Sequence, residues 1–264
     1  MCLYVAFLSH SLKYKSIINY VSAVRFMHTF LGYNATWENS FSVKATLKGY
    51  KRILGAPTVQ KLPVTIDMLK DIISRCDPVN DSGYIACILI GFFGMLRKAN
   101  LCPKSINCFD PQFNLARQDI ELTDYGALLN IRGSKVIQFQ QKVLQIPLVE
   151  HPTRSSICPV RAMKNHMRRV PASPTSPAFQ LHSGDPITHH KIRKFFKRKL
   201  IECGVDYKNI SLHSLRRGGA SFCHSRGAPL EMIQSMGDWA SLAVLCYLTR
   251  PLDLRIKTAK LMVC

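Results

Sequence analysis

The chain has 264 residues, of which 47% are hydrophobic, so it is long and apolar enough to form one large domain or two modest ones. Its 36 Lys and Arg outnumber 16 Asp and Glu, and the net charge of +20 favours a polyanionic partner, with nucleic acid ahead of an anionic membrane surface. The ten cysteines form no C-x-x-C pair and the longest apolar run, residues 84–96, has only 13 residues, which excludes a zinc or disulfide framework and a membrane span.

Residues 1–56 are predicted to be helical. Between positions 17 and 31, apolar residues recur every three or four residues, namely Ile17, Tyr20, Val21, Val24, Met27 and Leu31. A second helix over about 43–54 turns an apolar stripe inward and four cations outward: Lys44, Lys48, Lys51 and Arg52. Basic helix faces are often merely solvated, but four cations in one short helix favour phosphate contact. Residues 57–63, in a stretch rich in Gly and Pro, are predicted to be a linker.

Two helices and a small sheet are predicted next. Thr65 is expected to cap a helix that ends near Arg75, and an apolar helix over 82–96 runs directly into Arg97, which could simply reach solvent. From 116 to 149 the pattern becomes alternating, in ARQDIEL, ALLNIRG and VLQIPL, which predicts three antiparallel strands and two hairpins. Lys135 lies between the second and third strands, where a lysine is ordinarily solvated. The predicted fold class is mainly α with a small three-stranded antiparallel β-sheet.

A strongly basic helix is predicted near the C-terminal third of the chain. A helix from Cys158 to about Val170 precedes it, and Thr188 is expected to cap the basic one, which ends near Leu200. Between its apolar positions lie six cations: Lys191, Arg193, Lys194, Lys197, Arg198 and Lys199. This interleaving is typical of a helix that packs on the core and faces DNA. The adjacent His189 and His190 diverge on a helix, so we expect no metal site there.

The segment from Ser211 to Tyr247 concentrates residues suited to phosphate chemistry. His213 and Arg216 lie three apart and share a helix face, a second short helix is predicted over 229–236, and a Gly-Asp-Trp turn precedes the tyrosine. Arginine binds phosphate oxygens bidentately, histidine moves protons near neutral pH, and tyrosine can act as a covalent nucleophile. No acidic cluster suited to magnesium lies in this segment. The alternative is a buried helix pair with surface arginines and a core tyrosine.

The order H-x-x-R, G-x-W and Y resembles the tyrosine recombinases of the phage-integrase superfamily, most closely those of eukaryotic DIRS, Ngaro and Crypton elements. The resemblance implies catalytic roles for Arg97, Lys135 (or else Lys142), His213, Arg216, Trp239 and Tyr247, and DNA contact for Arg217. Two positions depart from the family pattern. Asp238 follows Gly237 where the family usually has His or Trp, and Asn100 stands three residues after Arg97, where an acid is frequent.

The resemblance also implies an architecture and a reaction. Residues 1–56 correspond to part of a helical core-binding domain, 57–63 to the linker and 64–264 to a tyrosine recombinase catalytic domain. Tyr247 is expected to attack a DNA phosphodiester and form a 3′-phosphotyrosine, with no metal, cofactor or nucleoside triphosphate. The partners expected are double-stranded DNA and, on paired sites, three further copies of the chain, because the segment after Tyr247 commonly docks on a neighbour in this family. A membrane partner is not expected.

Two other functions remain open from the sequence. One is a transposon-derived DNA-binding protein that keeps the fold without catalysis, and the other is a type IB topoisomerase, which shares the chemistry. Cysteines inside apolar runs, such as Cys87 and Cys246, indicate reduced thiols and therefore a reducing intracellular compartment. For an enzyme of this kind we expect the nucleus.

The excess positive charge predicts strongly salt-dependent binding to duplex DNA. Each phosphate neutralised contributes roughly 0.9 to the slope of log affinity against log salt, so about six contacts reduce affinity on the order of a thousandfold between 50 and 200 mM salt. Fluorescence anisotropy of a labelled duplex across this range measures the slope. A nearly flat response would rule out DNA as the main partner.

Overall fold

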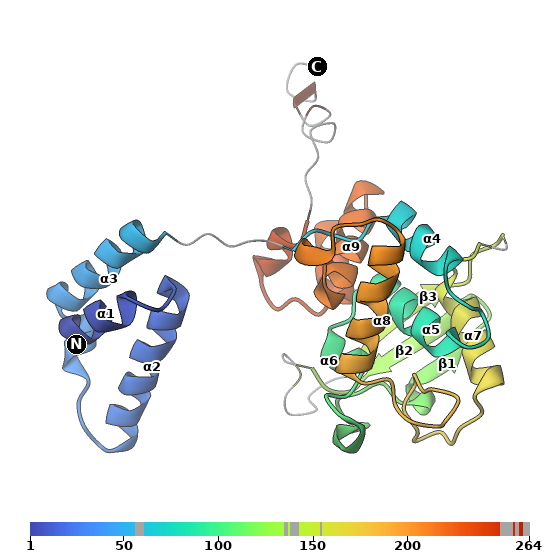
Figure 1. Cartoon of the computed structure of the whole chain (residues 1–264), viewed down its shortest axis with the longest axis horizontal. Helices are drawn as coiled ribbons and strands as arrows, with labels where there is room; N and C mark the ends of the chain where they lie inside the picture. The colour runs from blue at the N-terminus through green and yellow to red at the C-terminus, as the bar shows by residue number, and fades with distance from the viewer. Residues whose placement is uncertain are drawn as a thin grey trace. The chain divides into compact units, whose positions relative to one another are not determined.

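The computed structural model describes residues 1–55, 61–134, 137, 143–153, 155–248, 256, 259 and 260. The chain divides into two compact units, Met1–Gln60 and Lys61–Cys264 (Figure 1). None of the described helices is long and apolar enough to cross a bilayer.

The first unit consists of three helices and one short 3-10 turn. These are α1 (Cys2–Ser9), α2 (Tyr14–Phe30), η1 (Thr36–Asn39) and α3 (Phe41–Leu54). A small core of Val5, Leu8, Ile17 and Val21 joins α1 and α2. The predicted apolar stripe on α2 is buried only in part, because Tyr20, Met27 and Leu31 are about half exposed. The Ser40 hydroxyl caps α3 by accepting a hydrogen bond from the Val43 N–H at 3.3 Å.

The second unit is mainly helical and contains the small sheet. Its helices are α4 (Ile66–Ser74), α5 (Ser82–Phe93), α6 (Lys98–Leu101), α7 (Pro159–Arg169), α8 (His189–Glu202), α9 (Leu212–Ser225) and α10 (Leu230–Met236). Short 3-10 turns are η2 (Ile106–Cys108), η3 (Arg117–Asp119), η4 (Tyr207–Asn209) and η5 (Leu242–Cys246). The predicted caps of α4 and α8 are present, since Thr65 and Thr188 accept hydrogen bonds from the Met68 and Lys191 N–H groups.

The three predicted strands form one antiparallel sheet in the order β1 (Ile120–Leu122), β2 (Gly126–Ile131) and β3 (Leu144–Val149). Leu129 of β2 lies opposite Ile120 and Ile146, and all three side chains are buried in the main core. The first strand is shorter than predicted because residues 117–119 form a 3-10 turn. The fold class read from the sequence is therefore confirmed.

The almost wholly buried helix α5 organises the second unit, packing against α7 on one side and α9 on another. Two adjacent glycines let the backbone of α9 approach α5 and the segment before α4 very closely. A Cβ atom on Gly219 would lie 2.0 Å from the Phe92 carbonyl oxygen, and one on Gly218 would lie 2.2 Å from the Val64 carbonyl oxygen. Glycine ordinarily weakens a helix. Here α9 runs through both glycines to Ser225, and only glycine permits this backbone-to-backbone contact.

Candidate active site

Five of the six residues assigned catalytic roles in the sequence come together in the second unit: Arg97, His213, Arg216, Trp239 and Tyr247. Arg97 is the residue before α6, His213 and Arg216 lie on α9, Trp239 lies in the turn after α10, and Tyr247 follows η5. Lys135 and its alternative Lys142 lie outside the described residues. The geometry of the five shows what each can do.

Arg216 is the buried centre of the group, with 2% of its surface exposed. Its guanidinium group donates hydrogen bonds to the carbonyl oxygens of Met95 and Gly237 and stacks on Trp239, 3.8 Å from the ring centroid. Burial and then the nearby Arg97 cation lower the pKa of Arg216 to about 10, so it stays protonated at neutral pH. The residue therefore places a fixed positive charge in the pocket.

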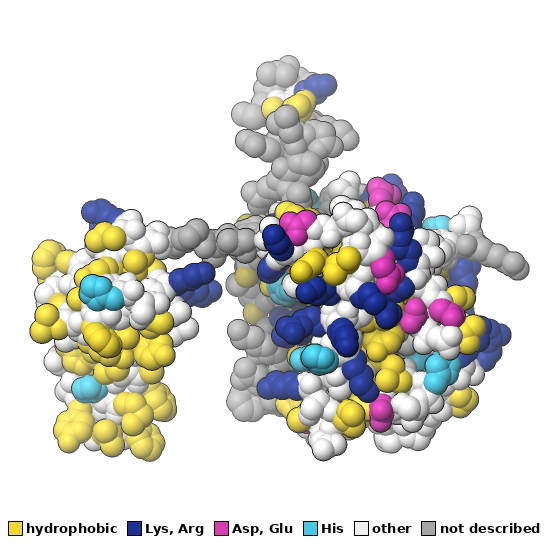
Figure 2. Space-filling model, viewed as in Figure 1, with side chains coloured by type: hydrophobic (Ala, Val, Ile, Leu, Met, Phe, Trp, Pro, Cys, Tyr) yellow, Lys and Arg dark blue, Asp and Glu magenta, His cyan; other side chains and the backbone are white. Residues whose placement is uncertain are grey.

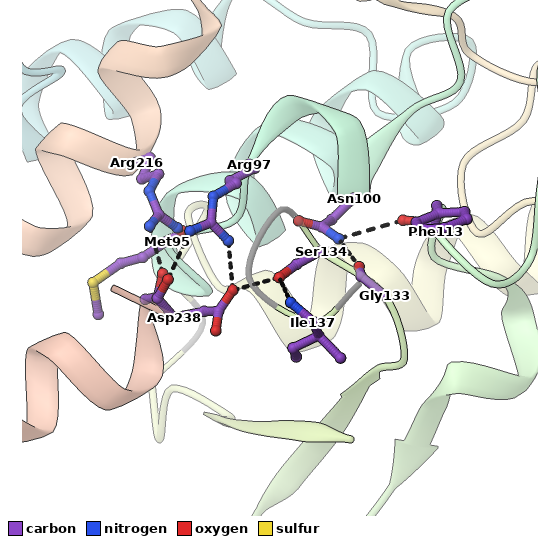
Figure 3. A network of polar contacts seen from close by, with 10 residues as sticks. Met95, Arg97, Asn100, Phe113, Gly133, Ser134, Ile137, Arg216 and Asp238 are labelled. Atoms are coloured by element: carbon purple, nitrogen blue, oxygen red, sulfur yellow. Dashed lines mark hydrogen bonds and ion pairs between the residues drawn. The ribbon is translucent and has the colours of Figure 1, made fainter. Parts of the chain in front are cut away.

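Arg97, the residue before α6, is held by Asp238 at two points. Its Nη1 lies 2.6 Å from the carboxylate Oδ2 of Asp238, and its Nη2 donates to the Asp238 carbonyl oxygen at 2.6 Å. The same Oδ2 accepts a hydrogen bond from the Ser134 hydroxyl at 2.6 Å, so Asp238 joins Arg97 to the turn after β2 (Figure 3). Arg97 remains 22% exposed, whereas the Asp238 carboxylate is only 5% exposed.

The Gly237-Asp238-Trp239 turn supports both arginines. Asp238 has a φ of 52° and Met95 a φ of 49°, and each contributes its carbonyl oxygen to an arginine of the pocket. Non-glycine residues seldom adopt such angles, although Asp tolerates them better than most. A Cβ atom on Gly237 would lie 1.6 Å from the Trp239 ring. Glycine is required here because the ring folds back over it.

Tyr247 lies at the end of η5 with its hydroxyl 2.9 Å from Nε2 of His213. Its ring meets Trp239 edge-on at 5.1 Å between centroids, and its carbonyl oxygen accepts a hydrogen bond from Ser221 of α9 at 3.0 Å. Partial burial, and then the cation of Arg216, lower the pKa of His213 below its usual 6.5. Both causes disfavour the imidazolium form, the packed side of the ring by desolvation and Arg216 by repulsion. A neutral His213 can accept the phenol proton at pH 7.

Sequence reasoning missed Asp238 and Ser134 as members of this group. Asp238 was seen only as a departure from the family pattern, and its contact with Arg97 links positions 141 residues apart. Asn100, the other departure, is buried and donates to the carbonyl oxygens of Gly133 at 2.7 Å and Phe113 at 3.3 Å. It therefore fixes the turn that carries Ser134. The buried Trp239 Nε1 has no partner among the described residues, while the ring stacks on Arg216.

The residues assigned to DNA contact fall into three groups. On α3 in the first unit, Lys44, Lys48, Lys51 and Arg52 are all exposed. On α8 in the second unit, Arg193, Lys194, Lys197 and Arg198 are exposed and Lys191 is partly so, and Figure 2 shows dark blue side chains gathered over this helix. Arg217 is partly buried and donates to the Lys61 carbonyl oxygen at 3.0 Å.

One cation of α8, Lys199, points into the protein and not toward solvent. The outward direction expected for Lys199 was wrong, because its Nζ is buried against the Arg75 carbonyl oxygen and lies 2.9 Å from Glu202. Among the described residues, no three His, Cys, Asp or Glu side chains cluster as they would around a metal ion.

Residues 126–251 match the model of the phage integrase family. The match runs from β2 past Tyr247 and so includes four of the five assembled residues. Sequence comparison with curated proteins finds no match.

Solved structures show the same fold at low sequence identity. The second unit has the catalytic fold of the tyrosine recombinases. A post-cleavage complex of the XerH site-specific recombinase with a palindromic difH substrate matches with a TM-score of 0.65 and 16% identity, over 93% of this chain and 67% of that one. The Tn1549 transposon integrase with transposon right end DNA gives 0.67 and 15%, over 98% and 83%. The XerA recombinase gives 0.56 and 14%, over 98% and 96%.

The environment of His213 predicts a titration midpoint below 6.5, because burial and neighbouring cations disfavour the imidazolium form. NMR of ring C–H signals across pH 4.5 to 8, with His213→Gln to assign the signal, measures it. The fully exposed reference is a free histidine in the same buffer. A midpoint above 6.5 would mean that His213 is protonated more readily than the pocket allows.

Proposed function

We propose that the chain is a site-specific DNA recombinase that cuts and rejoins DNA through a 3′-phosphotyrosyl intermediate. The single observation that best supports this is the 2.9 Å contact between the Tyr247 hydroxyl and Nε2 of His213, beside the cations of Arg97 and Arg216. A tyrosine, a neutral proton acceptor and two guanidinium groups are the parts that attack on a phosphodiester needs. The phage integrase domain and the recombinase fold support the same reaction.

The proposed step exchanges one phosphodiester for another. The Tyr247 oxygen forms a bond to phosphorus while the bond from phosphorus to the 5′ oxygen breaks. The phenol proton passes to His213, which matters because an unperturbed tyrosine has a pKa of about 10. Lys135, which lies outside the described residues, would supply a proton to the departing 5′ oxygen. The reverse sequence rejoins the strand, so no nucleoside triphosphate is consumed.

Arg97 and Arg216 would offset the charge that develops on the non-bridging phosphate oxygens. Arg216 and Trp239 each have a buried N–H, Nε and Nε1 respectively, without a partner among the described residues. Buried donors are nearly always paired in folded proteins, so an unpaired one calls for an explanation. A phosphate oxygen in the pocket would provide an acceptor, and this supports the proposal.

The finer parts of the proposal rest on the sequence resemblance. We propose that the enzyme serves the integration and excision of a transposable element of the DIRS, Ngaro or Crypton kind, and that it acts in the nucleus. The similarity to the Tn1549 transposon integrase in fold is consistent with such a role.

One observation favours a second function, that of a DNA-binding protein without catalysis. The Asp238 carboxylate lies 2.6 Å from Arg97 and so occupies an N–H group that a phosphate could use. A protein of this kind would bind duplex DNA through its basic helices and form no covalent adduct.

Tyr247→Phe tests the proposed function, because it removes only the nucleophilic oxygen. Wild-type protein incubated with nicked duplexes should form an adduct that survives SDS, and the variant should form none while binding duplex nearly as well. Gel analysis of labelled DNA measures the adduct, and anisotropy measures binding. Absence of an adduct from the wild type would favour the binding protein, and an adduct from the variant would identify another tyrosine as the nucleophile.

We further propose that the protein is a monomer in solution and a tetramer on two paired DNA sites. The 17 residues after Tyr247 include Leu252, Leu254, Ile256, Leu261, Met262 and Val263, and nearly all of them lie outside the described residues. Such an apolar segment after the nucleophile could dock on a neighbouring copy, as the resemblance implies.

Deleting residues 252–264 should abolish the complex with two duplexes and leave binding to one duplex nearly unchanged, because only contacts between copies are removed. Light scattering of the protein mixed with one duplex site, and with two, measures the mass of each complex. If the truncated protein still pairs two duplexes, the segment packs on its own domain.

A further inference from the structure

The contact between Asp238 and Arg97 holds the guanidinium group by two different atoms of one residue. The carboxylate binds Nη1 and the carbonyl oxygen binds Nη2, both at 2.6 Å. A guanidinium group has five N–H donors in one plane, so two contacts on neighbouring nitrogens fix the direction of that plane. Among the described residues these are the side-chain contacts of Arg97, and its other donors point to no protein acceptor there.

The Asp238 carboxylate is itself anchored. Its Oδ2 accepts a hydrogen bond from Ser134 at 2.6 Å, and the Ser134 hydroxyl accepts one from the Ile137 N–H at 3.1 Å. The same turn is held from the other side by Asn100, which donates to the Gly133 carbonyl oxygen at 2.7 Å (Figure 3). The position of Arg97 is thus tied to the end of β2 and not only to its own helix.

The backbone of Asp238 contributes to this arrangement. At a φ of 52°, the residue lies in the left-handed region, where Asp and Asn are the side chains best tolerated after glycine. The side chain and the carbonyl oxygen both reach Arg97 from this one residue. The residue type therefore satisfies a conformational requirement and a chemical one together.

Charge explains why such a hold is needed. Arg97 and Arg216 are close enough for the cation of one to lower the pKa of the other. Like charges repel, and Arg97 is the more exposed of the two, so without an anion beside it the side chain would turn toward solvent. Asp238 supplies that anion from the protein interior.

We infer that Asp238 is a positioning residue for the cleavage reaction, one that keeps the Arg97 guanidinium beside Arg216 in the orientation that receives the scissile phosphate. This inference rests on the proposed function. Asp238 itself does not contact the reacting atoms; it acts through Arg97. Its removal is expected to slow cleavage and to leave duplex affinity nearly unchanged, because affinity is shared among many basic residues.

The test compares Asp238→Asn with the wild type on two substrates. Asn keeps the shape and the left-handed backbone and removes only the charge. A pool of nicked duplexes of random sequence first yields, by recovery of wild-type adducts, one cleavable duplex. That duplex is then made with an ordinary phosphodiester and with a methylphosphonate at the cleaved position, which is uncharged and so needs less help from an arginine.

On the phosphodiester we expect Asp238→Asn to form its adduct about 100-fold more slowly, the loss typical of a misplaced catalytic group. On the methylphosphonate the difference should shrink to a few fold, and Arg97→Ala should show the same pattern. Ser134→Ala, which keeps the ion pair and removes the hydroxyl that anchors the Asp238 carboxylate, should show a smaller loss with the same dependence on substrate. This variant keeps the test decisive if Asp238→Asn folds poorly.

Asp119→Asn is the matched control. Asp119 is also buried and also pairs with an arginine, its Oδ1 lying 2.7 Å from Nε of Arg132. It should lower the melting temperature without changing the ratio between the two substrates.

Each other outcome overturns the inference in a distinct way. An equal loss on both substrates would make Asp238 a purely structural residue, and an unchanged rate on the phosphodiester would mean that Arg97 needs no such support. If the wild type forms no adduct with any duplex, the proposed function fails first, and the inference falls with it.

Discussion

The burial of the Arg216 guanidinium group is the constraint on which the rest of the pocket depends. Removing a charge of this size from water costs several kcal/mol unless the protein replaces its hydration. Here the replacement consists of two carbonyl oxygens, from Met95 and Gly237, and the face of Trp239. The Met95 carbonyl oxygen requires a backbone in the left-handed region, and Gly237 requires the absence of a side chain, because the Trp239 ring lies against it. The turn after α10 and the end of α5 are therefore shaped around one side chain.

The close contact between α9 and α5 makes this burial possible. On α9, Gly219 lies three residues after Arg216. It packs against the carbonyl oxygen of Phe92, which lies three residues before Met95 on α5's side of the contact. A larger side chain at Gly219 would move α9 outward and take Arg216 away from the Met95 carbonyl oxygen. The free energy lost through two glycines in a helix, about 1 kcal/mol each, is offset by this packing. Helix stability and site geometry are thus determined by the same pair of residues.

Much of this could be predicted from local patterns, and the failures have a common cause. Alternation predicted the three strands, and the spacing of His213 and Arg216 placed both on one face of a helix. The role of Asp238 could not be read, because it depends on a left-handed backbone and on a partner far away in the sequence. Lys199 was misassigned for a similar reason. Six cations on one helix do not reveal which of them faces the core. Glu202 is a local partner on the same helix, but the Arg75 carbonyl oxygen that receives Lys199 is brought there by the tertiary fold.

The engagement of both arginines with protein acceptors is compatible with phosphate binding. Two unit charges 4 Å apart in a medium of effective dielectric 20 interact by about 4 kcal/mol, so an unsupported pair of guanidinium groups would not stay together. The protein meets this repulsion during folding, with one interior carboxylate and three carbonyl oxygens. An incoming phosphodiester then meets cations whose direction is already fixed, and little reorganisation is left for the moment of reaction. The Asp238 carboxylate reduces the net positive charge that attracts phosphate by one. In return it fixes the direction of the Arg97 guanidinium group, and a fixed direction favours the transition state more than the ground state.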